Sequence, residues 1–181
     1  DMRAADILVK EHDAIMIVVD AAKAEAGRIT ATGNVNGKLV REMVEFFRNF
    51  VDKCHHGKEE KHYFPLLEAR GIPRFMGPIG CMLSEHDMGR GETGAIVRAL
   101  DAFEKGRAKA ATELAQHLQA YAELLTAHIH KENEILFKLG DTVLTPEDQS
   151  DLIDSFETAE REEMKEGEHD RYRAWVQKLL K

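Results

Sequence analysis

Proline and cysteine are scarce in this chain of 181 residues, which has four prolines and two cysteines. With so few prolines, long stretches are free to be helical. The cysteines, Cys54 and Cys81, are too few for a disulfide framework and form no CxxC pair. The sequence therefore favours a reducing, cytoplasmic setting over secretion.

Basic charge and long apolar runs are also lacking. The 25 Lys and Arg residues are outnumbered by 33 Asp and Glu, for a formal net charge of −8. Such a balance provides no basic stripe for phosphates, so nucleic acid is excluded as a partner class. No apolar run approaches the roughly 20 residues that a membrane helix needs. We therefore expect no membrane span, and no segment of this sequence has the pattern of a signal peptide, which disfavours secretion but leaves open a leader that was removed upstream.

What the chain does have is apolar residues at helical spacing almost everywhere, with little support for strands. Glycine-rich and proline-rich breaks such as "ATGNVNG" and "ARGIPRFMGP" divide it. The expected long helices span about 3–26, 37–69, 79–104 and 108–139. Beyond Gly140, Thr145 and Pro146 begin a fifth helix to about 165, and "RYRAWVQKLL" forms a short last one. The prediction is an all-α, up-down four-helix bundle over 1–140, with a C-terminal helical extension, 141–181, packed on it.

Two short patterns recur along the chain. "EHD" occurs at 11–13 and 85–87, and "HxxKExxxxF" occurs at 55–64 and 128–137, with offsets of 74 and 73 residues. The repeat indicates two similar helical hairpins that stack into the bundle. The repeated positions carry histidines and acids, so the duplication extends to the chemistry.

Those histidines and acids interrupt apolar stripes. His55 with Glu59, and His128 with Glu132, stand four residues apart on one helix face, while His12 and His86 each offer an imidazole from another helix. One such histidine alone is usually an ordinary core residue, but a matched set in two halves favours a metal site. Two buried carboxylates are costly without cations, and two divalent ions would neutralise them. Imidazole and carboxylate together suit iron or manganese, about 3.5–4 Å apart when carboxylates bridge.

The remaining histidines are expected to have lesser roles. His56, Glu60 and His130 fall off the apolar stripe and are predicted to face solvent, with His56 and Glu60 as substitutes for their neighbours if the helical register shifts by one. His62 is predicted to form a hydrogen bond to one of the metal-binding side chains without binding the metal itself. His117 lies too far along its helix, and His169 belongs to the extension.

At these residues the chain resembles the hemerythrin-like, or HHE cation-binding, family, over about 5–140. The resemblance rests on "CHHGKEEKHYFPLL", "EHDMGR" and "HIHKENEILF". It implies two Fe ions per chain, with the ligands His12, His55, Glu59, His86, His128 and Glu132. Hemerythrins that carry oxygen have a second histidine one turn after the first on the third helix, and here that residue is Arg90. A five-histidine oxygen carrier is thus disfavoured, and Arg90 is expected to pair with a carboxylate or to steer an anion.

The favoured function is a non-haem di-iron protein that binds or senses O2, NO or iron. The alternative is a di-iron enzyme on the same scaffold, which reduces NO or peroxide or donates iron for repair of iron–sulfur centres. A bundle with no metal, or with adventitious zinc, is the third possibility. A ferritin-like carboxylate bundle is a poorer match, because its second Glu-x-x-His motif would be Glu166 to His169, beyond the helix break. No zinc-hydrolase helix, phosphate loop or serine nucleophile elbow is present.

Overall fold

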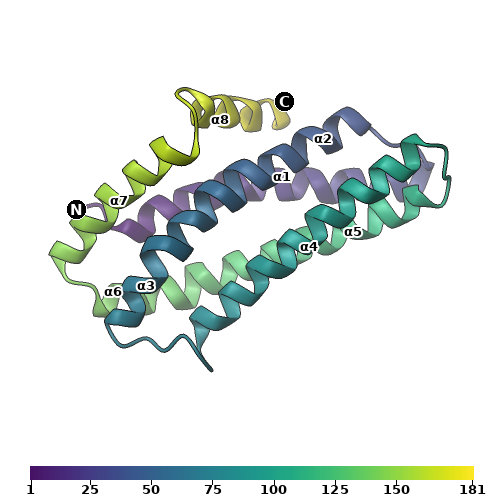
Figure 1. Ribbon diagram of the computed structural model, residues 1–181. Coiled ribbons are helices and arrows are strands. Elements are labelled where there is room, and N and C mark those ends of the chain that lie inside the picture. Colours follow the sequence, from purple (N-terminus) through teal and green to yellow (C-terminus); the bar gives the residue numbers. More distant parts are fainter.

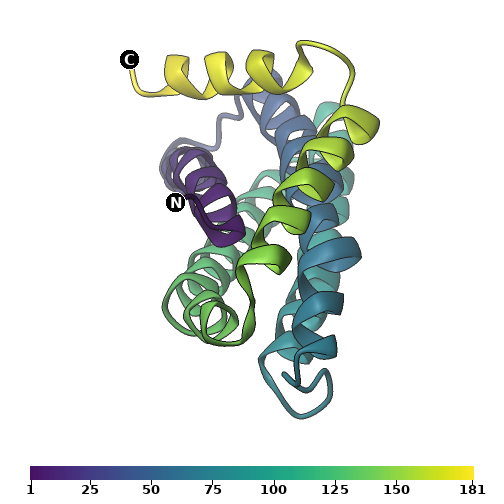
Figure 2. The same cartoon turned by 90° about the vertical axis from the view of Figure 1, so that its left-hand side faces the viewer.

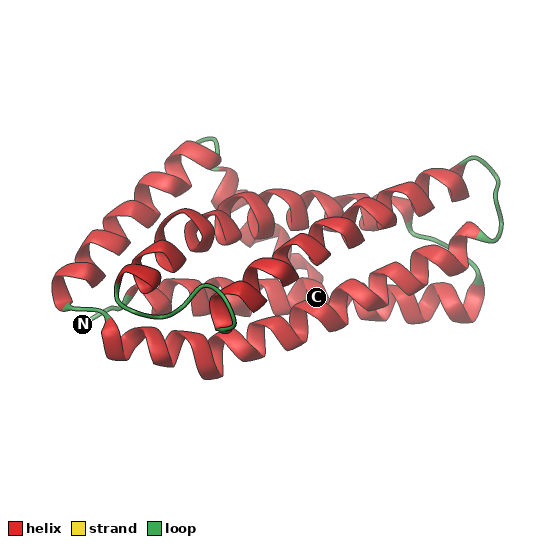
Figure 3. Cartoon of the chain, turned by 60° about the horizontal axis from the view of Figure 1, so that its bottom comes forward, coloured by secondary structure: helices red, strands yellow, loops and turns green.

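The computed structural model describes residues 1–181 and contains helices and connections, with no strand (Figure 3). The first and third long helices are α1 (Ala4–Thr32) and α4 (Pro78–Glu104). The second long helix, residues 37–69, comprises α2 (Gly37–Phe46), η1 (Phe47–His56), η2 (Glu59–Tyr63) and α3 (Phe64–Ala69). The fourth, residues 110–143, comprises α5 (Ala110–Lys131), η3 (Glu132–Leu136) and α6 (Phe137–Val143). The four lie side by side and alternate in direction (Figure 1), which confirms the predicted all-α bundle.

Two of the helix ends differ from the sequence prediction. The first helix does not stop near residue 26 but continues to Thr32, where Gly33 takes a left-handed φ of 72°. The hydroxyl groups of Thr30 and Thr32 donate to carbonyls one turn back, so these residues continue the helix. The fourth long helix passes through Gly140 to Val143, because glycine there allows close packing against Tyr63.

The extension consists of α7 (Pro146–Glu163) and α8 (Glu168–Leu179) on the outside of the bundle (Figure 2). Thr145 caps α7 by accepting a hydrogen bond from the backbone of Asp148, as predicted. α8 lies over α1 and α2, where the ring of Tyr172 meets Phe46 edge-on and Trp175 packs against it at a tilt. No helix combines the length and the apolar character that crossing a membrane requires.

The core is divided into two apolar clusters. The larger has 29 buried residues and includes Phe46, Phe47 and Leu118; the smaller has 13 and includes Leu8, Phe64 and Phe137. Between them the four long helices bury histidines and glutamates, together with Lys58. The fold therefore surrounds a polar layer with hydrophobic packing on both sides.

Three π-helical stretches, η1, η2 and η3, lie next to this layer. A π turn holds an extra residue, so it rotates every later residue around the helix axis. Ile135 and Leu139, which the 3.6-residue period places inside, are 56 % and 40 % exposed, and Leu136 and Gly140 are buried instead. In the second long helix Tyr63 and Leu67 likewise replace His62 and Leu66 as the most buried residues. The predicted inward faces are thus wrong by one position from η2 and from η3 onward.

Candidate metal centre

Two glutamates and four histidines meet in the polar layer, each exposing 1 % or less of its surface. Glu59 faces His55 of its own helix at 3.0 Å and His86 of α4 at 3.1 Å, one ring nitrogen Nε2 at each carboxylate oxygen. Glu132 repeats the arrangement with Nε2 of His128 at 3.2 Å and of His12 at 3.1 Å. The structure therefore brings together all six side chains that the spacing selects, and each carboxylate meets one imidazole from each half of the chain.

The other ring nitrogen, Nδ1, is anchored in all four histidines. His55 Nδ1 lies 3.1 Å from Glu11, and His128 Nδ1 lies 3.1 Å from Glu85, the acids of the two EHD motifs. The other two contacts join different halves of the chain. His12 Nδ1 lies 2.7 Å from the side-chain oxygen of Asn133, and His86 Nδ1 lies 3.0 Å from a carboxylate oxygen of Glu60. Carboxylate and amide oxygens can only accept, so these Nδ1 atoms donate, and in the neutral ring the lone pair of Nε2 points inward. Such anchoring is typical of histidines that bind metals.

The inward-facing atoms have no hydrogen-bond partner. The four Nε2 atoms and all four oxygens of Glu59 and Glu132 are buried and unsatisfied. Lone pairs that face one another in a dry interior are unfavourable unless a proton or a cation lies between them. This donor set therefore fits metal ions, and two groups of these side chains meet the spacing of a metal site.

The electrostatics of the site favour positive charge between these atoms. Burial opposes the charged imidazole, but the carboxylates of Glu59 and Glu11 prevail and raise the pKa of His55 to about 10. In the same way, Glu59 and Glu60 outweigh burial and raise the pKa of His86 to about 9. Burial also opposes ionisation of Glu132, yet His128 and His12 hold its pKa well below the ordinary value. A site that attracts protons this strongly would release them to a metal.

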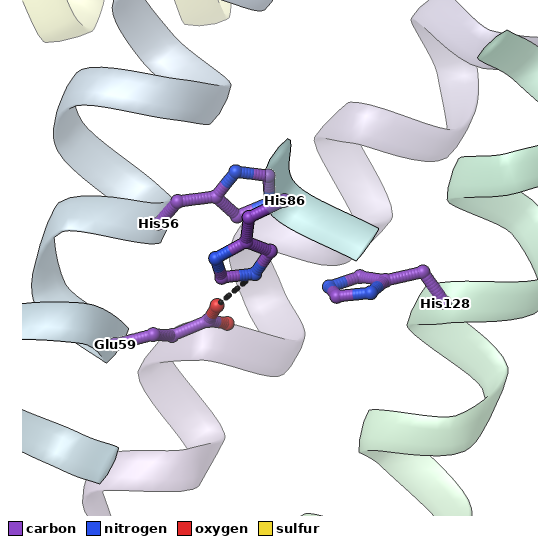
Figure 4. Close-up of side chains that lie close together, drawn as sticks. All are labelled: His56, Glu59, His86 and His128. Atoms are coloured by element: carbon purple, nitrogen blue, oxygen red, sulfur yellow. Dashed lines mark ion pairs between the residues drawn. The ribbon is translucent and has the colours of Figure 1, made fainter. Parts of the chain in front are cut away.

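His56 is the main correction to the sequence prediction. It was expected to face solvent, yet it is 5 % exposed and its ring stacks on that of His86, with centroids 3.7 Å apart and planes 15° apart (Figure 4). Successive residues of an α-helix are turned by about 100°, so ordinary periodicity does not place both His55 and His56 inside. The π geometry of η1, which has no simple sequence signal, does. Burial among other imidazoles holds the pKa of His56 well below its ordinary value.

The predicted surroundings of the remaining histidines and of Glu60 are correct in some cases and wrong in others. His130 is exposed, as expected. Glu60 is only partly exposed and bonds to His86 and Arg90, so its predicted solvent-facing role is wrong. His62 makes no hydrogen bond or ion pair, so the contact expected for it is absent. His117 pairs with Glu92, and His169 lies near Glu11 and Glu160.

Arg90 points away from the polar layer. Its guanidinium group contacts Asp52 at 2.9 Å, Glu60 at 2.9 Å and Asp87 at 2.8 Å. The expected carboxylate pairing is therefore confirmed. Because Glu60 in turn accepts from His86, Arg90 supports that imidazole from outside.

Sequence reasoning missed the roles of four repeated residues. Lys58 contacts Glu11 at 2.9 Å, and its counterpart Lys131 contacts Glu85, so each half holds its histidine through a Lys–Glu pair. Their recurrence in both copies of the pattern was the available signal. A further group, Glu11, Cys54 and His169, has metal-like spacing, but the ammonium group of Lys58 already supplies positive charge to Glu11 there.

A bundle of four helices with matched His-x-x-x-Glu pairs defines a class, and comparison with known proteins identifies it. Residues 3–139 match the model of the hemerythrin HHE cation-binding domain, and the chain belongs to this family. It is 24% identical over 157 residues to the uncharacterized proteins Mb2018 of Mycobacterium bovis and Rv1995 of Mycobacterium tuberculosis. The match covers 87% of this chain and 61% of each relative, so the chain spans less than two thirds of their length. No solved structure matches it.

Proposed function

We propose that the chain is a non-haem di-iron protein that binds or senses O2, NO or iron itself. Support comes from the eight buried, unpartnered nitrogen and oxygen atoms that face one another inside a cation-binding domain. Imidazole with carboxylate is a donor set that suits iron. No thiolate takes part, which argues against a structural zinc site of the cysteine type.

The six side chains divide between two metal positions. The first metal position lies among His12, His55, Glu59 and Glu132. The second lies beside His86 and His128 and shares Glu59. Glu59 and Glu132 each meet one histidine of each position, so both carboxylates would help to hold both ions.

When bound, such an iron pair supplies one-electron chemistry and coordination positions for a diatomic ligand. The protein contributes a dry setting, with the apolar clusters on both sides and Nδ1 anchors that keep the imidazoles from turning. The principal hollows at the surface are lined by residues other than these six side chains, so none of them forms a substrate pocket at the site.

Iron analysis of protein purified without added metal tests the proposal. We expect about two irons per chain with the near-ultraviolet and visible absorption of an oxygen-bridged iron pair. His55→Ala and Glu132→Ala should each lose most of this iron, whereas His130→Ala, a change at an exposed histidine, should retain it. Protein from iron-replete cells that holds zinc or no metal would contradict the proposal.

Turnover separates the binding protein from the alternative enzyme. The reduced protein should bind NO or O2 stoichiometrically. Multiple-turnover consumption of NO or peroxide, or transfer of iron to an iron–sulfur protein, would favour the enzyme instead. The proposed setting is the cytoplasm, because both cysteines are free and Cys81 is exposed.

A further inference from the structure

His56 belongs to the second metal position by geometry. One of its ring nitrogens lies within 4.8 Å of ligand atoms of Glu59, His86 and His128, and all four residues are buried. Figure 4 shows the four side chains converging, with the rings of His56 and His86 stacked and His128 opposite them. Three of these four are already ligands in the proposed function. His56 thus offers this group a third imidazole beside those of His86 and His128.

No hydrogen bond accounts for the burial of His56. Its Nδ1 is buried without a hydrogen-bond partner, and the nearest acid, Asp52, lies 3.5 Å away. A buried imidazole without partners is costly in the apolar interior. Coordination through the other nitrogen, Nε2, would draw the Nδ1 proton toward Asp52, the same division of roles that the four anchored histidines show.

Comparison of the two halves of the duplication shows that only the first half has a histidine at this position. Offsets of 73 residues relate His55 to His128 and Glu59 to Glu132, so the counterpart of His56 is Ile129. Ile129 is also buried, but an aliphatic side chain cannot bind a metal. The two metal positions are therefore unequal, although their other ligands match.

Arg90 supports the same conclusion from outside the site. Its guanidinium group holds Asp52, which faces His56, and Glu60, which accepts from His86. One cation thus fixes the acids behind both stacked rings. Arg90, one turn after His86 on α4, stays outside the site. Through Asp52 and Glu60 it holds the imidazoles of His56 and His86 in place.

We propose that His56 is a fifth imidazole ligand, bound to the iron at the second metal position through Nε2. This inference rests on the proposed di-iron function. The iron at the second position then has three imidazoles and the iron at the first has two. An added anion or diatomic ligand therefore binds at the first position, beside Ile129.

Proton NMR of the reduced, iron-loaded protein tests this by counting ligands. Each iron-bound imidazole gives a strongly shifted Nδ1–H signal that disappears in D2O. We expect five such signals in the wild type and four in His56→Leu, whose side chain is of similar size. Mössbauer spectra should show two unequal iron environments in the wild type that become nearly alike in the variant.

Three controls accompany the His56→Leu variant: a change at an exposed histidine, a check of folding, and the reverse change in the other half. His130→Leu changes an exposed histidine and should retain five signals. Circular dichroism of the iron-free His56→Leu protein checks that it is folded. Ile129→His, the reverse change, should add a signal and lower the affinity of the first position for azide at least tenfold.

The outcomes are distinct. A wild type with about two irons but only four signals, or a folded His56→Leu with five, overturns the inference and leaves the proposed function intact. A wild type that takes up no iron overturns both.

Discussion

Lys58 and Lys131 occupy matching positions in the two halves but differ in burial. Lys58 is fully buried and pairs with buried Glu11, whereas the side chain of Lys131 is 35% exposed. Removing one partner of a buried ion pair leaves an uncompensated charge, while a solvated pair contributes little. The same contact therefore has different consequences in each half.

We predict that Lys58→Met lowers the free energy of unfolding of the iron-free protein by about 3 kcal/mol. Lys131→Met, its matched control, should lower it by less than about 1 kcal/mol. Urea unfolding followed by circular dichroism measures both. Equal losses would show that burial does not distinguish the two pairs.

Which histidines converge could be predicted, since i to i+4 spacing and the repeat select His12, His55, His86 and His128 without any structure. The burial of His56 could not, because it depends on the π turns of η1 rather than on residue type. Glu11 and Glu85 were visible as repeated letters, but their contact with Nδ1 depends on how the helices pack. That the histidines bind iron, and that Glu11 and Glu85 hold iron-bound histidines in place, stays a prediction.

At the scale of elements, the π turns decide where side chains point. The four long helices and most of their ends followed from apolar periodicity and from glycine and proline breaks. The faces after Glu59 and Glu132 did not follow, because each π turn adds a residue that a regular 3.6-residue period does not contain. Gly140 faces Tyr63 as a result.

Gly140→Ala should destabilise the protein by about 1–3 kcal/mol, because the added methyl group would meet the Tyr63 hydroxyl and lie 3.1 Å from Leu67. Gly27→Ala is the matched change in an open helical position, with no atom nearby. It should stabilise by about 0.5–1 kcal/mol through helix propensity. Thermal unfolding of the two variants checks the signs, and a stable Gly140→Ala protein would contradict the packing.

At the scale of the whole molecule, Asp148 fastens the extension to the bundle. Two hydrogen bonds from Arg70, at 2.8 and 2.7 Å, join the start of α7 to the end of the second long helix. Together with the backbone of Thr145 they hold the pKa of Asp148 well below its ordinary 3.8. A lowered folded pKa means that the stabilisation is present above pH 3.8 and is lost as the pH falls further.

We therefore expect Asp148→Asn to lower Tm by a few degrees at pH 7. The gap to the wild type should stay constant down to about pH 5 and narrow below about pH 4, as the Asp148 carboxylate of the unfolded wild type begins to take up protons. Differential scanning calorimetry across this range measures the gap. A gap that widens in acid would mean that Arg70 does not stabilise the charged form.

The crossing of ligands between the halves has a consequence for folding order. Glu59 takes His86 from the second hairpin, and Glu132 takes His12 from the first. A nascent chain that has emerged only to Ala69 holds Glu59, His12 and His55 but lacks His86, His128 and Glu132, so it has no closed site. In the proposed function, capture of the metal pair therefore follows the docking of both hairpins and is a late event in folding.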